Sequence, residues 1–226
     1  MDVAHLIQTI ALYAIPGIFA ITLHEAAHGY AARHFGDLTA YQAGRISLNP
    51  VRHIDPIGTL LIPAVVLFAS GGSFAFGWAK PVPVNFGRLR NPKRDMLWVA
   101  AAGPGANLFM AVLWAIIFKA VFFFPANYFS EPALKMALGG ILINLILMIL
   151  NLFPLPPLDG GRIAVSLLPR RLAFRFAKIE PYGMIILLVL LLTRVLQAVM
   201  VPVLVLTLSM LGVVFGVDFA RLILGI

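Results

Sequence analysis

The stretch LHEAAH at residues 23–28 places two imidazoles and a carboxylate inside an apolar segment, residues 3–32, that has the composition of a membrane-spanning helix. At 1.5 Å per residue, a helix of this length can cross a hydrocarbon core of about 30 Å. Glu25 is the only acidic or basic residue of the segment apart from its histidines. Ionisable groups at such a depth are costly, so their presence indicates a functional site.

The spacing of the polar residues in this stretch is that of a metal-binding helix. His24 and His28 are four residues apart, which places both imidazoles on one face of a helix, where they can bind one metal ion. Glu25 follows the first histidine, and in the zinc-peptidase motif H-E-x-x-H this glutamate acts as general base and not as a ligand. In a soluble helix such a short pattern is more often a solvated surface feature. Inside hydrocarbon no water solvates it, so we favour a metal site.

Composition identifies the chain as a polytopic membrane protein. The hydrophobic fraction is 61%, charged residues make up 12%, and the mean hydropathy is +0.97. No ordinary soluble domain of this length has such values. Most of the basic residues behind the net charge of +8 lie in residues 33–56, 73–95 and 154–180. This clustering between apolar runs follows the positive-inside rule, so we expect a lipid bilayer as partner and no nucleic acid.

Further apolar runs follow at residues 57–70, 96–124, 133–152, 182–192 and 199–219. The first of these is short for a full crossing and suits a tilted or re-entrant helix. The sequence therefore predicts an all-α polytopic membrane protein with about five to six transmembrane or re-entrant helices.

A small membrane-associated β element is expected between the first and third helices. Residues 41–50 alternate roughly between apolar and polar side chains and end in an Asn-Pro stop, which predicts a short strand and a turn. Residues 78–85 contain Pro81 and Pro83, which exclude both a helix and an interior strand and leave an extended edge. Such an edge can pair with an unfolded peptide, although a plain connecting loop explains it equally well.

A second polar landmark is the stretch NLFPLPPLDGG at residues 151–161, where three prolines stop the fourth helix. Irregular backbone at membrane depth is tolerated only where it is buried in protein or lines a cavity. A catalytic zinc usually has three protein ligands and keeps its fourth position for water. With no cysteine in the chain, the third ligand must be nitrogen or oxygen, and Asp159 is the best candidate. Asp55 is the rival, although an acid before proline commonly caps a turn or helix.

Three other polar residues are candidates for the substrate side of the site. Asn151 and Asn107 carry amides that can donate hydrogen bonds to an oxyanion, although asparagines in membrane helices more often serve packing. Asn107 ends the stretch GPGAN at residues 103–107, whose small residues permit close helix approach. His53 is a candidate for a proton carrier or an additional ligand, or an interfacial histidine without a catalytic role.

Taken together, the two motifs resemble the site-2 proteases, a family of intramembrane zinc metalloproteases. The resemblance rests on H-E-x-x-H at residues 24–28 and on N-x-x-P-x-P-x-L-D-G at residues 151–160, and GPGAN is similar to an element of the family's core helix. It implies zinc on His24, His28 and Asp159, Glu25 as general base, and Asn151 near the substrate carbonyl. The chain is similar to a minimal form of the family, without a PDZ or CBS domain.

The expected function is hydrolysis of peptide bonds in or near transmembrane segments of membrane-protein substrates, as in regulated intramembrane proteolysis by a zinc metalloendopeptidase. One alternative is a transporter, which predicts repeated halves that the sequence lacks. The other is a non-catalytic scaffold, which would be expected to have lost Glu25 or a ligand.

We expect one integral-membrane peptidase domain over residues 1–226, with a catalytic core at about 1–165 and C-terminal helices at about 180–226. A prokaryotic cytoplasmic membrane is the expected location, with multiple crossings and the active site toward the cytoplasm.

Overall fold

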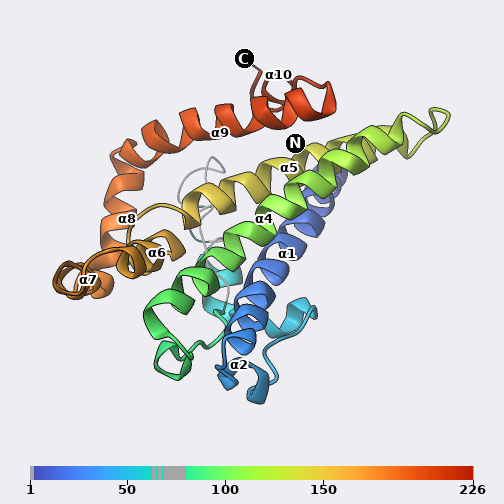
Figure 1. Cartoon of the computed structure of the whole chain (residues 1–226). Coiled ribbons are helices and arrows are strands. Elements are labelled where there is room, and N and C mark those ends of the chain that lie inside the picture. The colour runs from blue at the N-terminus through green and yellow to red at the C-terminus, as the bar shows by residue number, and fades with distance from the viewer. Residues whose placement is uncertain (1–2, 63–64, 66–67, 69–79, 226) are drawn as a thin grey trace.

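The computed structural model describes residues 3–62, 65, 68 and 80–225, and in this part of the chain it contains helices and loops but no strand (Figure 1). The all-α prediction is confirmed for these residues. The long helices are α1 (Val3–His34), α4 (Pro92–Val121), α5 (Ser130–Asn151) and α9 (Val195–Phe215). The short helices are α2 (Thr39–Gln42), η1 (Pro50–Arg52), η2 (Pro56–Leu61), η3 (Phe86–Arg88), α6 (Asp159–Leu167), α7 (Arg170–Ala177), η4 (Glu180–Tyr182), α8 (Gly183–Leu192) and α10 (Phe219–Leu224).

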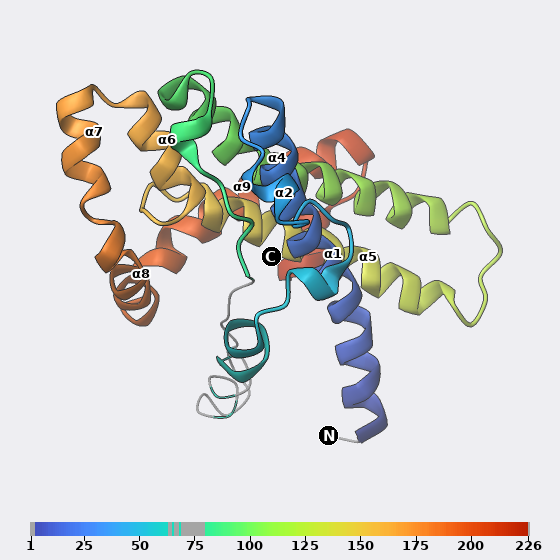
Figure 2. The ribbon, with the colours of Figure 1, turned by 90° about the horizontal axis from the view of Figure 1, so that it is seen from below.

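Helices α1, α4 and α5 pack side by side, with α1 and α4 running in opposite directions and α4 joined to α5 by a hairpin (Figures 1 and 2). Helix α9 crosses over α5, and α10 folds back onto the end of α9. The main core lies between α4, α5, α9 and α10, where Phe118, Ile141, Leu208 and Phe219 are buried together. Helix α6 packs on α4 beside this bundle. The loop that joins the end of α5 to α6 is thereby brought to the middle of α1 and α4.

Three helices of the described chain, α4, α5 and α9, are long and apolar enough to cross a bilayer. The chain is therefore a membrane protein, and the number of its crossings stays a prediction. The crossing predicted at residues 182–192 is not confirmed, because α8 alone is too short for it. Its 10 residues extend over only about 15 Å, half of a hydrocarbon core of about 30 Å. It ends because Arg194 adopts a left-handed conformation with φ of 61° between α8 and α9.

The strand predicted over residues 41–50 is also wrong, because local hydrogen bonds turn this stretch into helix and turn. Asp37 accepts hydrogen bonds from the backbone N–H and the hydroxyl of Thr39 and so fixes the start of α2. Gly44 then ends that helix with a φ of +63°. Asn49 accepts from the N–H of Val51 and caps η1 in the same way. The alternation of apolar side chains was real, but side chains that cap turns decide the backbone here.

The stretch at residues 80–85 is extended and forms no ladder with a described second strand, and hydrogen bonds connect this part of the chain to the residues that follow α1. The N–H of Asn85 donates to the Asp37 carboxylate at 2.6 Å, and the N–H of Arg90 donates to the carbonyl of Phe35 at 2.9 Å. Burial raises the pKa of Asp37, but its hydrogen bonds to Thr39 and Asn85 outweigh this and lower the pKa, so the carboxylate is charged at neutral pH. Residues 78–79, and residues 63–64, 66–67 and 69–70 of the run at 57–70, lie outside the described residues.

Candidate metal centre

Three side chains from two helices meet between α1, α4 and α6. His24 and His28 lie one turn apart on α1, and Asp159 is the first residue of α6. The His24 Nε2 and His28 Nε2 atoms are 3.1 Å apart, and each is 3.2 Å from Asp159 Oδ2. All three residues are between 7% and 9% exposed. Among the described residues, this is the one group of three or more histidine and acidic side chains close enough to hold a metal ion.

Hydrogen bonds on the far side of each imidazole fix where its proton lies. The Nδ1 atom of His28 is 2.7 Å from the carbonyl of Val99, which can only accept, so Nδ1 carries the hydrogen. In the neutral ring the Nε2 atom then presents a lone pair toward Asp159. His24 also carries its hydrogen on Nδ1, because of the amide that faces it.

The His24 Nδ1 atom is 2.6 Å from Asn107 Oδ1. The Asn107 amide nitrogen donates to the carbonyl of Ala20 at 3.2 Å and to Asn144 Oδ1 at 3.1 Å, which identifies the Asn107 atom facing His24 as its oxygen. Asn144 in turn donates to the carbonyl of Gly140 at 2.8 Å, so the orientation of the whole chain of amides is determined. His24 therefore donates through Nδ1 and also presents a lone pair at Nε2.

The Nε2 atoms of both histidines and the Oδ2 atom of Asp159 thus point lone pairs at one another with no proton between them. Lone pairs repel one another at this distance, so the arrangement is unfavourable unless a cation lies between them. Asp159 Oδ2 is buried without a hydrogen-bond donor, consistent with this arrangement. Donors at about 2.0–2.1 Å from a tetrahedral zinc are separated by about 3.3 Å from one another, close to the spacing found here. The residues therefore fit zinc, with nitrogen and carboxylate oxygen as the donor set.

Gly103 keeps the space beside these donors open. A Cβ atom at this position would lie 2.4 Å from His28 Nε2 and 2.6 Å from His24 Nε2. No real Cβ approaches so closely, so a side chain would occupy space that the imidazoles and their ion need. Close helix approach in GPGAN was predicted from its small residues, but the contact of Gly103 with His24 and His28 was not.

The turn between α5 and α6 places Asp159 through two glycines. A Cβ on Gly160 would lie 2.2 Å from the carbonyl oxygen of Leu152, and one on Gly161 would lie 2.2 Å from the Pro156 nitrogen. Only glycines allow the first turn of α6 to pack directly on the proline-rich loop. This contact aims the start of α6 at α1.

Glu25 lies next to the first histidine, and its Oε2 atom accepts a hydrogen bond of 2.7 Å from the backbone N–H of Val82. Pro81 and Pro83 have no N–H, so Val82 supplies the one backbone donor of this tripeptide. Two backbone carbonyls next to it, those of Lys80 and Pro81, accept from Arg45 Nη2 at 2.9 and 3.3 Å. The extended stretch is thereby held against Glu25.

The other residues named from the sequence lie elsewhere or have different partners. Asn107 uses both amide hydrogens on Ala20 and Asn144 and lies behind His24. Asn151 donates one amide hydrogen to the carbonyl of Leu147 at 3.0 Å. His53 is buried, with Nε2 2.9 Å from the carbonyl of Ser47, and is not part of the three-donor group.

Asp55 caps η2. Its Oδ1 atom accepts from the backbone N–H groups of Ile57 at 3.0 Å and Gly58 at 2.7 Å, as expected for an acid before a proline. It is not a member of the three-donor group among the described residues, whereas Asp159 is. The Asn107–Asn144 hydrogen bond was not predicted, although paired asparagines in neighbouring apolar helices could have indicated it.

Replacing Asn107 by leucine is expected to weaken zinc binding by about 10- to 100-fold, the usual effect of losing a hydrogen-bond partner of a ligand. The leucine fills the space but leaves the Nδ1 hydrogen of His24 unpaired, so the ring is free to rotate. Competition with a chelator of known affinity measures the change. Asn127→Leu, in the exposed loop after α4, is the control and should bind zinc as the wild type does. Equal affinities for all three proteins would contradict the positioning role.

Comparison with known proteins decides the family. The model of peptidase family M50 matches residues 127–193, which include the proline-rich turn and Asp159. YwhC of Bacillus subtilis, named as a zinc metalloprotease, is 37% identical over 190 residues, covering 83% of each chain. The chain belongs to peptidase family M50, the site-2 proteases. Rip2 of Mycolicibacterium smegmatis, also named as a zinc metalloprotease, is 30% identical over 80% of this chain and 66% of its own length.

Rip2 of Mycobacterium tuberculosis is 28% identical over 68% of this M50 chain and 59% of its own length. No solved structure matches the chain. The M50 assignment makes the chain a zinc metalloprotease, as its two motifs indicated, and the donor group at His24, His28 and Asp159 agrees with a zinc cofactor. The family and the names of the relatives favour this enzyme class over a transporter or a non-catalytic scaffold.

Proposed function

We propose that this metalloprotease hydrolyses peptide bonds in or near the transmembrane helices of membrane-protein substrates, as in regulated intramembrane proteolysis. The observation that carries the proposal is the convergence of three unprotonated donors, at His24, His28 and Asp159, beside helices long enough to cross a bilayer. A peptide bond must come to that depth to be cut. The substrates best placed to reach it are themselves membrane helices.

In this proposal His24, His28 and Asp159 hold zinc, which when bound polarises the substrate carbonyl and activates a water molecule. The carbonyl of Val99 and the side chain of Asn107 hold the two imidazoles in the tautomer that binds metal. This arrangement costs no reorganisation during the reaction, because both partners are already in place. The whole chain, residues 1–226, is proposed to act as one peptidase domain.

Glu25 is proposed as general base. Its Oε2 atom is held by the Val82 N–H, so the carboxylate is oriented and its second oxygen can accept a proton from the attacking water. The proton then passes to the leaving amine. Asn151, which uses one of its two amide hydrogens on Leu147, can donate the other to the developing oxyanion.

The extended stretch at residues 80–85 is proposed to hold the unwound substrate. A helical carbonyl is shielded by its own hydrogen bonds, so the substrate must be extended at the cleaved bond. Pairing of backbone groups with a partly exposed extended segment binds such a conformation without a sequence requirement. The stretch already contacts Glu25 through Val82, which would bring the paired substrate to the general base.

Changing Val82 to proline is expected to lower cleavage by at least tenfold while zinc content stays unchanged. The substitution removes the N–H that orients Glu25 and keeps a side chain of similar size. Val82→Ala is the matched control, because it keeps the N–H and loses two methyl groups. Turnover and zinc content are measured for both. Equal losses in the two variants would show that packing of the valine, and not its N–H, matters.

We also propose that the protein is a multi-pass component of a prokaryotic cytoplasmic membrane with its site on the cytoplasmic side. The basic residues support this orientation, because those at 33–56, 73–95 and 154–180 flank the ends of α1, α4 and α5 that approach the site.

The test uses the purified full chain in lipid nanodiscs with a panel of single-helix membrane proteins. Mass spectrometry of the products locates each cut. The proposal expects cuts within or beside the apolar segment, abolished by a chelator and restored by zinc. Zinc-dependent cuts confined to soluble, unfolded peptides would contradict the proposed substrate while leaving the metalloprotease assignment intact.

A further inference from the structure

A second polar site lies outside the metal centre, in the loops that follow α1. A cavity of about 560 Å³ opens between the end of α2, the region around η1 and Lys80. Of the described residues, three that line it are basic, Arg45, Arg52 and Lys80, and the others are uncharged. None of these described lining residues is acidic. The local charge of the cavity is therefore about three positive units at neutral pH.

The two arginines are fixed at the cavity by backbone contacts. Arg45 Nη2 donates to the carbonyls of Lys80 and Pro81, and Arg52 Nη1 donates to the carbonyl of Gly44. Within the described part of the chain, none of the three cations forms an ion pair with a carboxylate. Like charges held near one another repel, and an anion between them relieves this repulsion.

Exposed apolar side chains lie next to the basic residues of the cavity. Leu48 and Val51 are 61% and 71% exposed, although both are apolar, and they lie in the same loops as the three cations. Basic residues next to exposed apolar side chains are typical of segments that lie at the boundary between headgroups and acyl chains. A ligand there needs a negative headgroup and tolerates apolar neighbours.

We propose that this cavity binds the phosphate of an anionic ligand, supplied by a phospholipid headgroup or by free phosphate. Planar guanidinium groups match the tetrahedral oxygens of a phosphate, and Lys80 adds a mobile ammonium on the open side. The cavity is large enough for a headgroup. Lys80 also lies two residues before Val82, so the ligand would sit beside the stretch that contacts Glu25.

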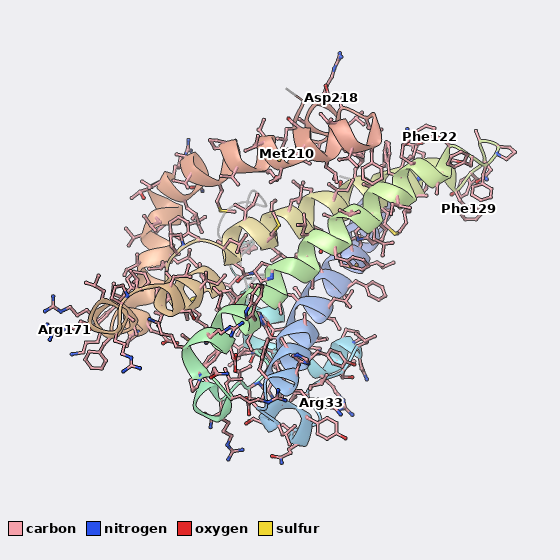
Figure 3. The ribbon with its side chains drawn as sticks, in the orientation of Figure 1. Arg33, Phe122, Phe129, Arg171, Met210 and Asp218 are labelled. Atoms are coloured by element: carbon pink, nitrogen blue, oxygen red, sulfur yellow. The ribbon has the colours of Figure 1, made fainter. Side chains whose placement is uncertain are left out.

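The experiment measures binding of short-chain phosphatidylglycerol to the detergent-purified full chain by native mass spectrometry, with short-chain phosphatidylcholine and inorganic phosphate as comparisons. The test protein carries Arg52→Gln and Lys80→Gln, which leave Arg45 in place. The control carries Arg170→Gln and Arg171→Gln, an equal loss of charge on α7, where Arg171 points away from the fold (Figure 3).

Phosphatidylglycerol is expected to bind the wild type and the control alike and the test protein at least tenfold more weakly. Lys80→Gln alone, a milder change, should weaken binding at least threefold and covers the case in which the double variant misfolds. Competition by inorganic phosphate at millimolar concentration would identify free phosphate as a sufficient source, and its absence would identify the lipid. Equal weakening in test and control proteins, or no preference over phosphatidylcholine, would overturn the proposal.

Discussion

Glu25→Gln is expected to keep about one zinc per chain and to lose cleavage by roughly 10²- to 10⁴-fold, the range for removal of a general base. Glutamine has the size of glutamate and its oxygen can still accept from the Val82 N–H, so the local structure is preserved. It cannot accept a proton from water. Elemental analysis and turnover of a cleavable membrane substrate measure the two quantities on one preparation.

Glu131→Gln provides the matched control, because this exposed acid at the start of α5 pairs only with Lys135 among the described residues. Its cleavage rate should equal that of the wild type. A Glu25→Gln protein that cleaves at the wild-type rate would show that another group takes the proton. Loss of zinc together with activity would place Glu25 among the groups that hold the metal.

Gly103→Ala is expected to abolish zinc binding, and with it all activity, although it adds only a methyl group. That methyl would lie within 2.6 Å of both imidazoles, in a wall formed by two packed helices that cannot easily separate. Either the methyl fills the ion's position or α1 and α4 move apart and the donors no longer converge. Zinc content per chain measures the effect.

Gly105→Ala is the control for this substitution. It lies two residues further along the same helix, and a Cβ there has no described neighbour within 4 Å. Alanine also has the higher helix propensity, so this variant should fold and bind zinc as the wild type does. If Gly103→Ala binds a full zinc per chain, the structure's placement of α4 against the histidines is incorrect.

The long helices, and the grouping of His24, His28 and Asp159 as possible metal ligands, could be predicted from the sequence because local patterns indicate both. The apolar runs at 96–124 and 133–152 became α4 and α5, since bilayer-length apolar segments have few alternatives to a helix. His24 and His28 lie on one face through helix geometry alone. Asp159 could be chosen over Asp55 because proline next to Asp55 already indicated a cap, and the structure shows that cap.

Contacts between distant segments were not predictable in the same way. The bond from Val82 to Glu25 joins residues 57 positions apart, and that from Asn107 to His24 joins residues 83 positions apart. No local spacing encodes such pairs. The strand expected over 41–50 failed for the opposite reason, because capping by Asp37 and Asn49 overrode the alternation of apolar side chains. The alternation of apolar residues indicates which side chains are buried, but the capping hydrogen bonds determine the backbone conformation there.

The central claim is that His24, His28 and Asp159 form one zinc site, and zinc content of the detergent-purified chain tests it most directly. The wild type is compared with His24→Ala, Asp159→Ala and Asp55→Ala by elemental analysis. We expect about one zinc per chain in the wild type and Asp55→Ala, and none in the other two. Zinc retained by a folded Asp159→Ala protein, or lost from Asp55→Ala, would move the third ligand away from Asp159 and contradict the site described here.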